Sequence, residues 1–299
     1  MKILCIGHCV YDISLPFDDF PEENKKYRIE NREESGGGPA CNAAYLLGKW
    51  GMDVSMAGMV GNDEYGKKII EELQEVNVKT DYIETSYEHK TSTSFIIVNT
   101  KNGSRTLINL PMPYTPLKKC ELDFSPEIIL IDGHDYLTSK RIINKYEKAI
   151  TVLDAGRYRE EIIEICKSVK YLVASKEFAE EATKIKCDFN NKSSLAEIYQ
   201  NMKNKFPKPE IIITLEENGV LYCENNNIKL LPGMDIVEKD TTGAGDIFHG
   251  AFVYALANNY ELEKALKYAN ITAGISCTRF NPRKSIPTLD EVIVEYEKL

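Results

Sequence analysis

A single short stretch decides the fold of this chain: Asp240-Thr241-Thr242-Gly243-Ala244-Gly245-Asp246. Apolar residues follow it with helical spacing, at Ile247, Phe248, Ala251, Phe252, Ala255 and Leu256. The pattern predicts a tight turn that leads into a helix. Because its two glycines lack side chains, a bulky anion could approach the backbone amides. The unpaired N–H groups and the dipole of a helix start favour phosphate there.

Asp246 lies in the first turn of the predicted helix. A carboxylate would repel phosphate if phosphate binding were the only task of this turn. Its presence is explained if it takes a proton from a nucleophile that attacks the phosphate. The structural alternative is an acidic residue that the helix dipole favours.

Composition limits the classes of protein that this chain can represent. Its 299 residues suffice for one large domain or two small ones, and 43% are hydrophobic, which supports a sizeable core. The net charge of −9 argues against a general nucleic-acid or membrane-surface binder, although a single nucleotide could be held locally. No apolar run approaches the ~18 residues of a membrane span.

The cysteines indicate a reducing compartment. Eight are scattered along the chain without a Cys-x-x-Cys pair, so we expect neither a zinc ribbon nor a thioredoxin-type motif. A cytoplasmic location fits free thiols best. The apolar N-terminus is short and interrupted by His8 and Asp12, which predicts a buried strand and not a signal peptide.

Strands and helices alternate along most of the chain. Strands are expected at residues 2–10, 54–60, 128–131, 151–154, 171–174, 211–215 and 220–223. Helices are expected at residues 39–50, 65–76, 140–149 and 195–206. This alternation predicts an α/β fold with a mostly parallel sheet that helices cover on both faces.

Two segments depart from the alternation. Residues 12–35 are charged and carry two prolines, and residues 91–113 contain the turn Asn102-Gly103 between two alternating runs, which is typical of a hairpin. We expect them to form a small β-sheet lid over a ligand cleft, within a single domain that spans residues 1–299. The alternative is that they extend the edge of the main sheet.

Two other glycine-containing segments precede predicted helices, one after a predicted strand and one after the expected lid segment. The run Gly61-Asn-Asp-Glu-Tyr-Gly66-Lys67-Lys68 is not a P-loop, because Lys68 stands where a Ser or Thr must bind magnesium. Gly36-Gly37-Gly38-Pro39 suits a lid hinge that leads into a helix. Asn42, in the first turn of that helix, could present its amide to sugar hydroxyls.

Together, Gly37-Gly38-Pro-Ala-Cys-Asn42, the segment from Gly58 to Gly66, and the stretch that ends at Asp246 resemble the ribokinase-like (PfkB family) carbohydrate kinases. The resemblance covers essentially the whole chain. It implies a Rossmann-like, doubly wound sheet and an ATP-dependent transfer of phosphate to a hydroxyl, which we expect to be primary, of a small sugar or sugar derivative. Asp246 would be the general base, and Gly243, Ala244 and Gly245 would supply the amides of an anion hole.

The resemblance also implies the residues that bind the two substrates. Asp12, Gly37, Gly38 and Asn42 would bind the sugar. Residues that would bind ATP are Thr214, Glu216, Gly219, Asn270 and Ser175. Glu216 replaces a glycine that is usual in this nucleotide loop, and a structural polar residue is the alternative for Asn270.

Two kinds of ion are implied as well. Asp240, Thr242 and Ser285 match a monovalent-cation site, which would hold K⁺, although Asn281 replaces a common glycine nearby. Mg²⁺ is expected because it neutralises the β- and γ-phosphates, and Glu177 would orient it through water.

Several basic residues are candidates for substrate contact. Arg157 follows a strand at the edge where α/β proteins bind ligands, so it could contact an anionic substituent. Arg105, in the hairpin, is better explained as a solvated surface residue. His8 and His134 end apolar strands and could touch substrate or be structural.

The chain admits other functions. A nucleoside kinase of the same fold would use a stacking aromatic near the lid, for which Tyr11, Phe17 and Tyr27 are candidates. A non-catalytic nucleotide- or sugar-binding regulator would bind without turnover. A Rossmann oxidoreductase is disfavoured because no Gly-x-Gly-x-x-Gly follows the first strand. The exposed edge of the lid predicts a homodimer formed through the lid.

Overall fold

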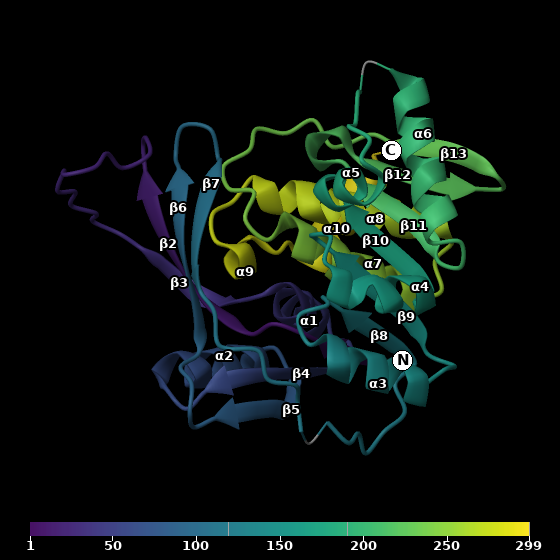
Figure 1. The fold of residues 1–299 in the computed structure, drawn as a ribbon. Coiled ribbons are helices and arrows are strands. Elements are labelled where there is room, and N and C mark those ends of the chain that lie inside the picture. Colours follow the sequence, from purple (N-terminus) through teal and green to yellow (C-terminus); the bar gives the residue numbers. More distant parts are fainter. Residues whose placement is uncertain (119, 190, 299) are drawn as a thin grey trace.

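The computed structural model describes residues 1–118, 120–189 and 191–298. Within them, the main sheet has nine strands in the order β13-β12-β11-β10-β9-β8-β1-β4-β5 (Figure 1). The strands are β1 (Lys2–Ile6), β4 (Asp53–Gly61), β5 (Lys79–Ser86), β8 (Ile128–Ile131), β9 (Ile150–Ala155), β10 (Tyr171–Ser175), β11 (Glu210–Thr214), β12 (Val220–Glu224) and β13 (Asn227–Leu231). Along the sheet, each pair of neighbouring strands from β5 to β11 is parallel. Strand β12 pairs antiparallel with both β11 and β13. The predicted α/β class is confirmed.

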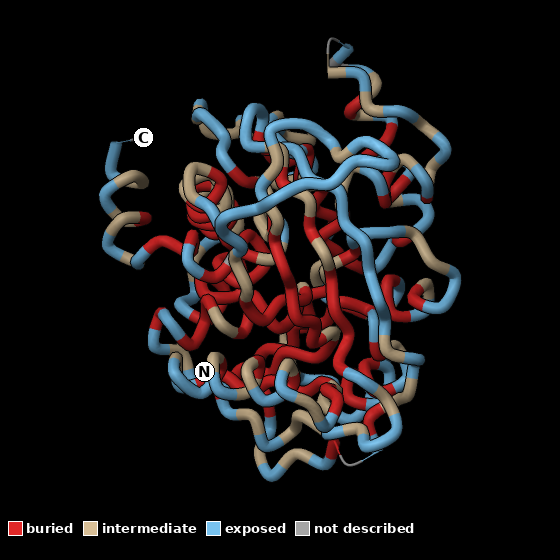
Figure 2. The backbone as a smooth tube through the Cα atoms, turned by 90° about the vertical axis from the view of Figure 1, so that its left-hand side faces the viewer, coloured by how far each residue is buried: buried red, intermediate tan, exposed pale blue. Residues whose placement is uncertain are grey.

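Helices cover both faces of this sheet. They are α1 (Pro39–Lys49), α2 (Glu64–Glu75), α3 (Tyr136–Lys145), α4 (Ile163–Ser168), α5 (Lys176–Thr183), α6 (Lys192–Lys205), α7 (Ala244–Ala257), α8 (Leu262–Cys277), α9 (Pro282–Ser285) and α10 (Leu289–Tyr296), with short 3₁₀ turns η1 (Glu160–Ile162) and η2 (Glu216–Asn218). One core contains residues of α1, α2, α7 and α8, and the other contains residues of α3 to α6. Because the central strands are buried on both faces, they read as continuous apolar runs. Figure 2 shows this buried backbone at the centre of the molecule.

A second, four-stranded sheet stands beside the main one, in the order β3-β2-β6-β7 (Figure 1). We call it the lid sheet; its strands are β2 (Val10–Phe17), β3 (Glu33–Gly37), β6 (Ser92–Asn99) and β7 (Arg105–Leu110). β2 and β6 pair in parallel, and the other two pairs are antiparallel. The two irregular segments therefore form the expected small sheet and do not extend the edge of the main sheet.

Two predicted elements have different limits in the structure. The single strand expected at residues 2–10 is wrong, because β1 ends at Ile6 and β2 of the lid sheet begins at Val10. A side chain at Gly7 would overlap the carboxyl group of Asp132, and the chain turns there. The helix expected at residues 140–149 begins earlier, because Asp135 caps α3 by accepting a hydrogen bond from the Thr138 amide at 3.1 Å.

The segment that resembled a P-loop is a structural turn. Asp63 caps α2 by accepting from the Gly66 amide at 3.0 Å, and it also accepts from the backbone and the hydroxyl of Thr91. It thereby ties the start of α2 to the residue before lid strand β6. No helix in the described ranges combines the length and the apolarity that a membrane crossing requires.

Candidate active site

The candidate site lies where the carboxyl ends of β1, β8 and β9 meet the starts of α1 and α7. In open α/β sheets, ligands bind at this edge. The polar contact that joins the two helices is a hydrogen bond of 2.8 Å from the Asn42 side-chain amide to the Asp246 carboxylate, 204 residues away in the chain. The structure therefore brings the predicted sugar-binding residue and the predicted base together.

Two glycines allow neighbouring groups to pack closely against the backbone that leads into α1. A Cβ atom on Gly38, which has φ of 99°, would overlap the carbonyl oxygen of His8, and one on Gly37 would overlap the carboxylate of Asp12. Asp12 itself is buried on lid strand β2. The Asp12 carboxylate consequently lies against Gly37, and Asn42 follows in the first turn of α1.

The two carboxylates of the site are hard to ionise. Burial raises the pKa of Asp246 to about 6, the charge of Asp154 adds to this shift, and the hydrogen bond from Asn42 opposes it. Burial also raises the pKa of Asp12 to about 7, and Asp246 is the next contributor. A carboxylate with a pKa close to neutrality is suited to accept a proton.

The turn before α7 leaves room for an anion. Gly243 adopts a left-handed conformation, with φ of 75°, as the residue that precedes the helix. Apart from its chain neighbours and the backbone of its own helix, no described atom lies within 4 Å of the position that a Cβ atom on Gly245 would take. The surface beside Gly245 is therefore open, and the start of a helix favours a phosphate group there. The Ala244 amide already donates to the Thr241 carbonyl at 3.3 Å.

The hairpin of the lid sheet reaches this turn. Arg105, at the start of β7, donates a hydrogen bond from Nη1 to the Thr241 hydroxyl at 2.5 Å. That hydroxyl also lies 3.5 Å from the carbonyl oxygen of Gly103. Arg105 is exposed, as expected, but it is not simply solvated, because it contacts the glycine-rich stretch.

Two of the three predicted cation-binding residues, Asp240 and Thr242, are buried in the loop before α7. The Asp240 carboxylate accepts from the Thr242 amide at 2.9 Å and from the Asn281 amide at 3.2 Å. The buried Thr242 hydroxyl has no hydrogen-bond partner within the described part of the chain. Ser285 is buried in the adjacent α9. This set of oxygens is compatible with a small cation.

Asn281, which stands where a glycine is common, has a backbone angle φ in the region that glycine favours. Its φ is 71°, which asparagine tolerates better than most residues. Its side chain accepts hydrogen bonds from the amides of Arg283 and Lys284 at 3.1 and 3.2 Å. A side-chain turn therefore stabilises the loop in place of glycine.

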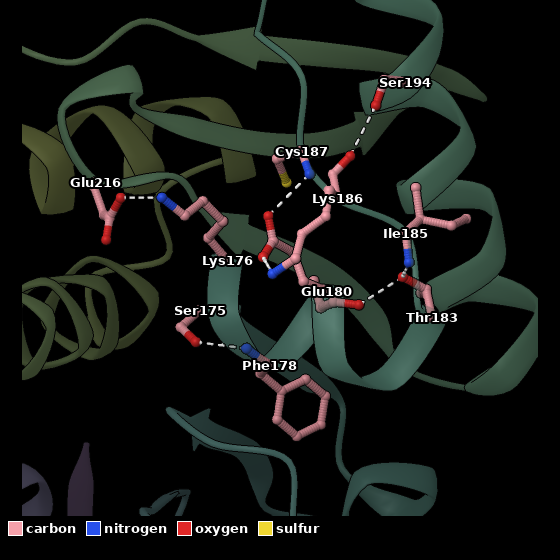
Figure 3. A network of polar contacts seen from close by, with 11 residues as sticks. Ser175, Lys176, Phe178, Glu180, Thr183, Ile185, Lys186, Cys187, Ser194 and Glu216 are labelled. Carbon is pink, nitrogen blue, oxygen red and sulfur yellow. Dashed lines mark hydrogen bonds and ion pairs between the residues drawn. The ribbon is translucent and has the colours of Figure 1, made fainter.

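Four of the five predicted nucleotide-binding residues lie at or shortly after the ends of β10 and β11: Ser175, Thr214, Glu216 and Gly219. Glu216 occupies the usual glycine position with a left-handed φ of 56°, and Lys176 forms an ion pair with it (Figure 3). Gly219 has φ of 93°, and any side chain there would overlap the Leu231 carbonyl. Thr214 ends β11. The altered loop thus retains two left-handed residues.

The remaining predicted residues have structural partners. Ser175 caps α5 by accepting from the Phe178 amide at 2.9 Å (Figure 3). Its hydroxyl donates to the Gly156 carbonyl. The side-chain amide of Asn270 donates to the carbonyl of Pro232 at 2.8 Å. Arg157 and Glu177 form an exposed ion pair of 3.7 Å.

Arg283, which sequence reasoning missed, orients Asn42. It is buried, pairs with Glu72, and donates from Nε to the Asn42 side-chain oxygen at 3.4 Å. With its oxygen held there, the Asn42 amide nitrogen points toward Asp246. Glu72 also accepts from the Gly36 amide at 2.9 Å, which links the lid hinge to the same network. No local pattern around Arg283 signals this role.

Sequence reasoning also missed the buried acids of the strand ends. Asp132 accepts from the amides of His8, Ala40 and His134 at 2.8, 3.2 and 2.9 Å, and its carboxylate lies 3.2 Å from the His134 ring. Burial alone would raise the pKa of Asp132, but the charge and hydrogen bonds of His134 outweigh burial and hold the pKa well below its usual range.

Asp154 and His249 form a second pair beside Asp246. The His249 ring nitrogen Nδ1 lies 3.3 Å from the Asp154 carboxylate and 2.6 Å from the carbonyl of Gly245. Burial raises the pKa of Asp154, and His249 opposes the shift. In the sequence, only two predicted positions hinted that these residues lie near the base: Asp154 ends a predicted strand, and His249 is in the predicted helix that carries Asp246.

The aromatic residues near the lid stack on each other. Tyr11 is buried and its ring lies parallel to that of Tyr65, with centroids 4.5 Å apart. Phe17 and Tyr27 meet edge to face at 5.5 Å. Tyr11 therefore already has an aromatic neighbour and is not a bare platform for a nucleobase.

Comparisons with known proteins agree with this geometry. The model of the pfkB family carbohydrate kinases matches residues 1–289. The ribokinase of Bacillus subtilis (strain 168) is 27% identical over 98% of both chains, and the ATP-dependent ribose-1-phosphate kinase of Halopiger xanaduensis is 24% identical over 98% of this chain and 97% of its own.

The fold is also that of solved ribokinases. The structure of Arabidopsis thaliana ribokinase complexed with ribose and ATP superposes with a TM-score of 0.83 at 18% identity, over 98% of this chain and 97% of that one. The predicted class of enzyme, an ATP-dependent phosphotransferase, is confirmed by the family match. On this evidence, the chain belongs to the pfkB family of carbohydrate kinases.

Proposed function

We propose that this protein transfers the γ-phosphate of ATP to a primary hydroxyl of a small sugar or sugar derivative, with Asp246 as the general base. The observation that carries the proposal is the contact between Asn42 and Asp246 at the start of α7. It supports a single site that would combine an amide for the sugar, a carboxylate of raised pKa and a turn for the transferred phosphate.

Each part of the site has a task in this reaction. Asp12, Asn42 and the amides of Gly37 and Gly38 bind hydroxyls and orient the sugar. Asp246 takes the proton of the attacking hydroxyl. The amides of Gly243, Ala244 and Gly245 stabilise the charge that develops on the transferred phosphate. The lid sheet covers the sugar and excludes water, which suppresses hydrolysis of ATP.

The nucleotide lies over the ends of β10 and β11 in this proposal. Thr214, Gly219 and the left-handed Glu216 shape its loop, and Ser175 and Asn270 border it. Glu177 would hold Mg²⁺ through water, and the metal would neutralise the β- and γ-phosphates. Arg157, beside Glu177, remains a predicted contact to an anionic substituent of the substrate.

The free state of all eight cysteines supports a reducing, cytoplasmic environment.

The buried loop around Asp240 would hold K⁺. Its donors would be Asp240, Thr242 and Ser285, and the unpartnered Thr242 hydroxyl supports this assignment. Because Asp240 contacts the loop of Asn281 and the turn before α7, the cation would order the anion hole.

The lid would also form a homodimer. All six residues of β7, which is an edge strand of the lid sheet, are exposed. Three of them are large and apolar: Leu107, Ile108 and Leu110. A second copy of the chain could cover this edge by pairing strands.

The substitution Asp246→Asn tests the role of the base. It keeps the shape of the side chain, so the melting temperature and ATP binding should persist while kcat falls by at least ~100-fold, the range of lost general-base catalysis. The matched control is Asp290→Asn, in the first turn of α10. The assay covers ribose, fructose, sugar acids and nucleosides. Near-normal turnover by Asp246→Asn would refute the assignment.

The pH profile tests the environment of Asp246. Because only the ionised carboxylate can accept a proton, kcat/KM should fall about tenfold per pH unit below about pH 6. The groups that face Asp246 are Asp12, Asp154, His249, Arg105 and Asn42. Since Asp154 raises the pKa of Asp246, Asp154→Asn should move the acid limb to lower pH. An acid limb that stays in place would contradict this account.

Potassium should activate the enzyme. At equal ionic strength, KCl should give a higher rate and a higher melting temperature than tetramethylammonium chloride, because a bound ion stabilises the folded state. Asp240→Asn should abolish both differences. Equal rates and melting temperatures in the two salts would exclude the cation site.

Light scattering tests the dimer. We expect a particle of twice the mass of one chain, and Leu107→Lys with Leu110→Lys should convert it to the monomer. The control is Leu137→Lys, an exposed leucine of α3. A monomeric wild-type protein at micromolar concentration would overturn the dimer.

A further inference from the structure

Arg159 is a partly buried cation at the edge of the candidate site. It lies between β9 and η1, and its Nη2 atom is 3.2 Å from the position that a Cβ atom on Gly133 would take. Its guanidinium makes no hydrogen bond or ion pair within the described part of the chain, whereas those of Arg157, Arg279 and Arg283 pair with glutamates. A guanidinium that is partly removed from water without a partner gains from an arriving anion.

His134 stands next to Arg159 with its ring partly exposed. It stacks on His8 with centroids 4.7 Å apart, and 43% of its side chain remains accessible. Asp132 lies 3.2 Å from Nδ1, which leaves Nε2 as a second donor when the imidazole is protonated. Burial lowers the pKa of His134, but the charge and the hydrogen bond of Asp132 outweigh burial and raise it. The ring therefore carries more positive charge than an ordinary histidine does at the same pH.

These residues border the predicted sugar-binding segment. The carbonyl of His8 packs against Gly38, and the carboxylate of Asp132 accepts from the Ala40 amide at 3.2 Å, so both contact the start of α1 that carries Asn42. The nearby acids are compensated. Asp132 is surrounded by the N–H donors of His8, Ala40 and His134, and Asp154 lies 3.3 Å from His249.

We propose that Arg159 and His134 bind an anionic substituent of the sugar, a carboxylate or a phosphate, separate from the hydroxyl that Asp246 deprotonates. This assignment rests on the proposed kinase function and names its substrate class: a sugar acid or a sugar phosphate. Arg159 supplies a planar fork that matches either group, and His134 supplies a second donor. A neutral sugar leaves both groups unpaired.

The test compares kcat/KM for three substrates with the same carbon chain: a neutral sugar, the corresponding sugar acid and the corresponding sugar phosphate. The wild-type enzyme should prefer one of the anionic compounds. Arg159→Gln should lower kcat/KM for that compound by about 10- to 100-fold, as expected for a lost hydrogen bond to a charged group, mainly through KM. Turnover of the neutral sugar should not change. Lys167→Gln on α4 removes an exposed charge and serves as control.

Calorimetry separates this inference from the proposed function. Binding of the three compounds is measured to Asp246→Asn and to the double variant Asp246→Asn with Arg159→Gln. The inference is supported if an anionic compound binds more tightly than the neutral sugar to Asp246→Asn and this advantage is lost in the double variant. If the wild-type enzyme then turned over none of the compounds, that result would refute only the kinase function. A preference for the neutral sugar, or an equal loss for charged and neutral compounds in Arg159→Gln, overturns the role of Arg159. The acid and the phosphate arms show which anion the site accepts.

Discussion

The hydrogen bond between Asn42 and Asp246 is the constraint on which the rest of the site depends. It joins the first turns of α1 and α7, which follow the lid hinge and the glycine-rich stretch. Asp246 would otherwise be a carboxylate largely removed from water without a donor, a costly arrangement. Arg283 fixes the direction of the bond by holding the oxygen of the same amide. The chemistry therefore depends on residues from both ends of the chain.

The lid sheet is attached to this site at two points. At its hinge, the Gly36 amide donates to Glu72, which pairs with Arg283. At its tip, Arg105 donates to Thr241 in the turn before α7. A change in the position of the lid sheet would thus alter the contacts of Arg283, which orients Asn42, and those of the turn before α7. In the proposed reaction, enclosure of the substrate would therefore be coupled to assembly of the site.

The charges around the site are a further constraint on the binding of an anionic substrate. The chain has a net charge of −9 and gathers Asp12, Asp132, Asp154 and Asp246 at one edge of the sheet, yet its substrate ATP is an anion. Each acid is compensated in a different way. Asp132 is surrounded by N–H donors, Asp154 lies against His249, and the pKa values of Asp12 and Asp246 are raised. Arg105 adds positive charge near Asp246, and Arg159 adds it near His134.

The sequence by itself determined the α/β class, the lid segments, and the residues of the glycine-rich stretch, because these follow from local periodicity, turn chemistry and a contiguous motif. It also named Asp12 and Asn42. Only the tertiary structure decided that the first strand breaks at Gly7 and that Glu216 and Asn281 have the positive φ angles that glycine favours. It alone also brought Arg283, Asp154 and Arg159 to the site. Those features arise from contacts between residues far apart in the chain, which local patterns do not encode.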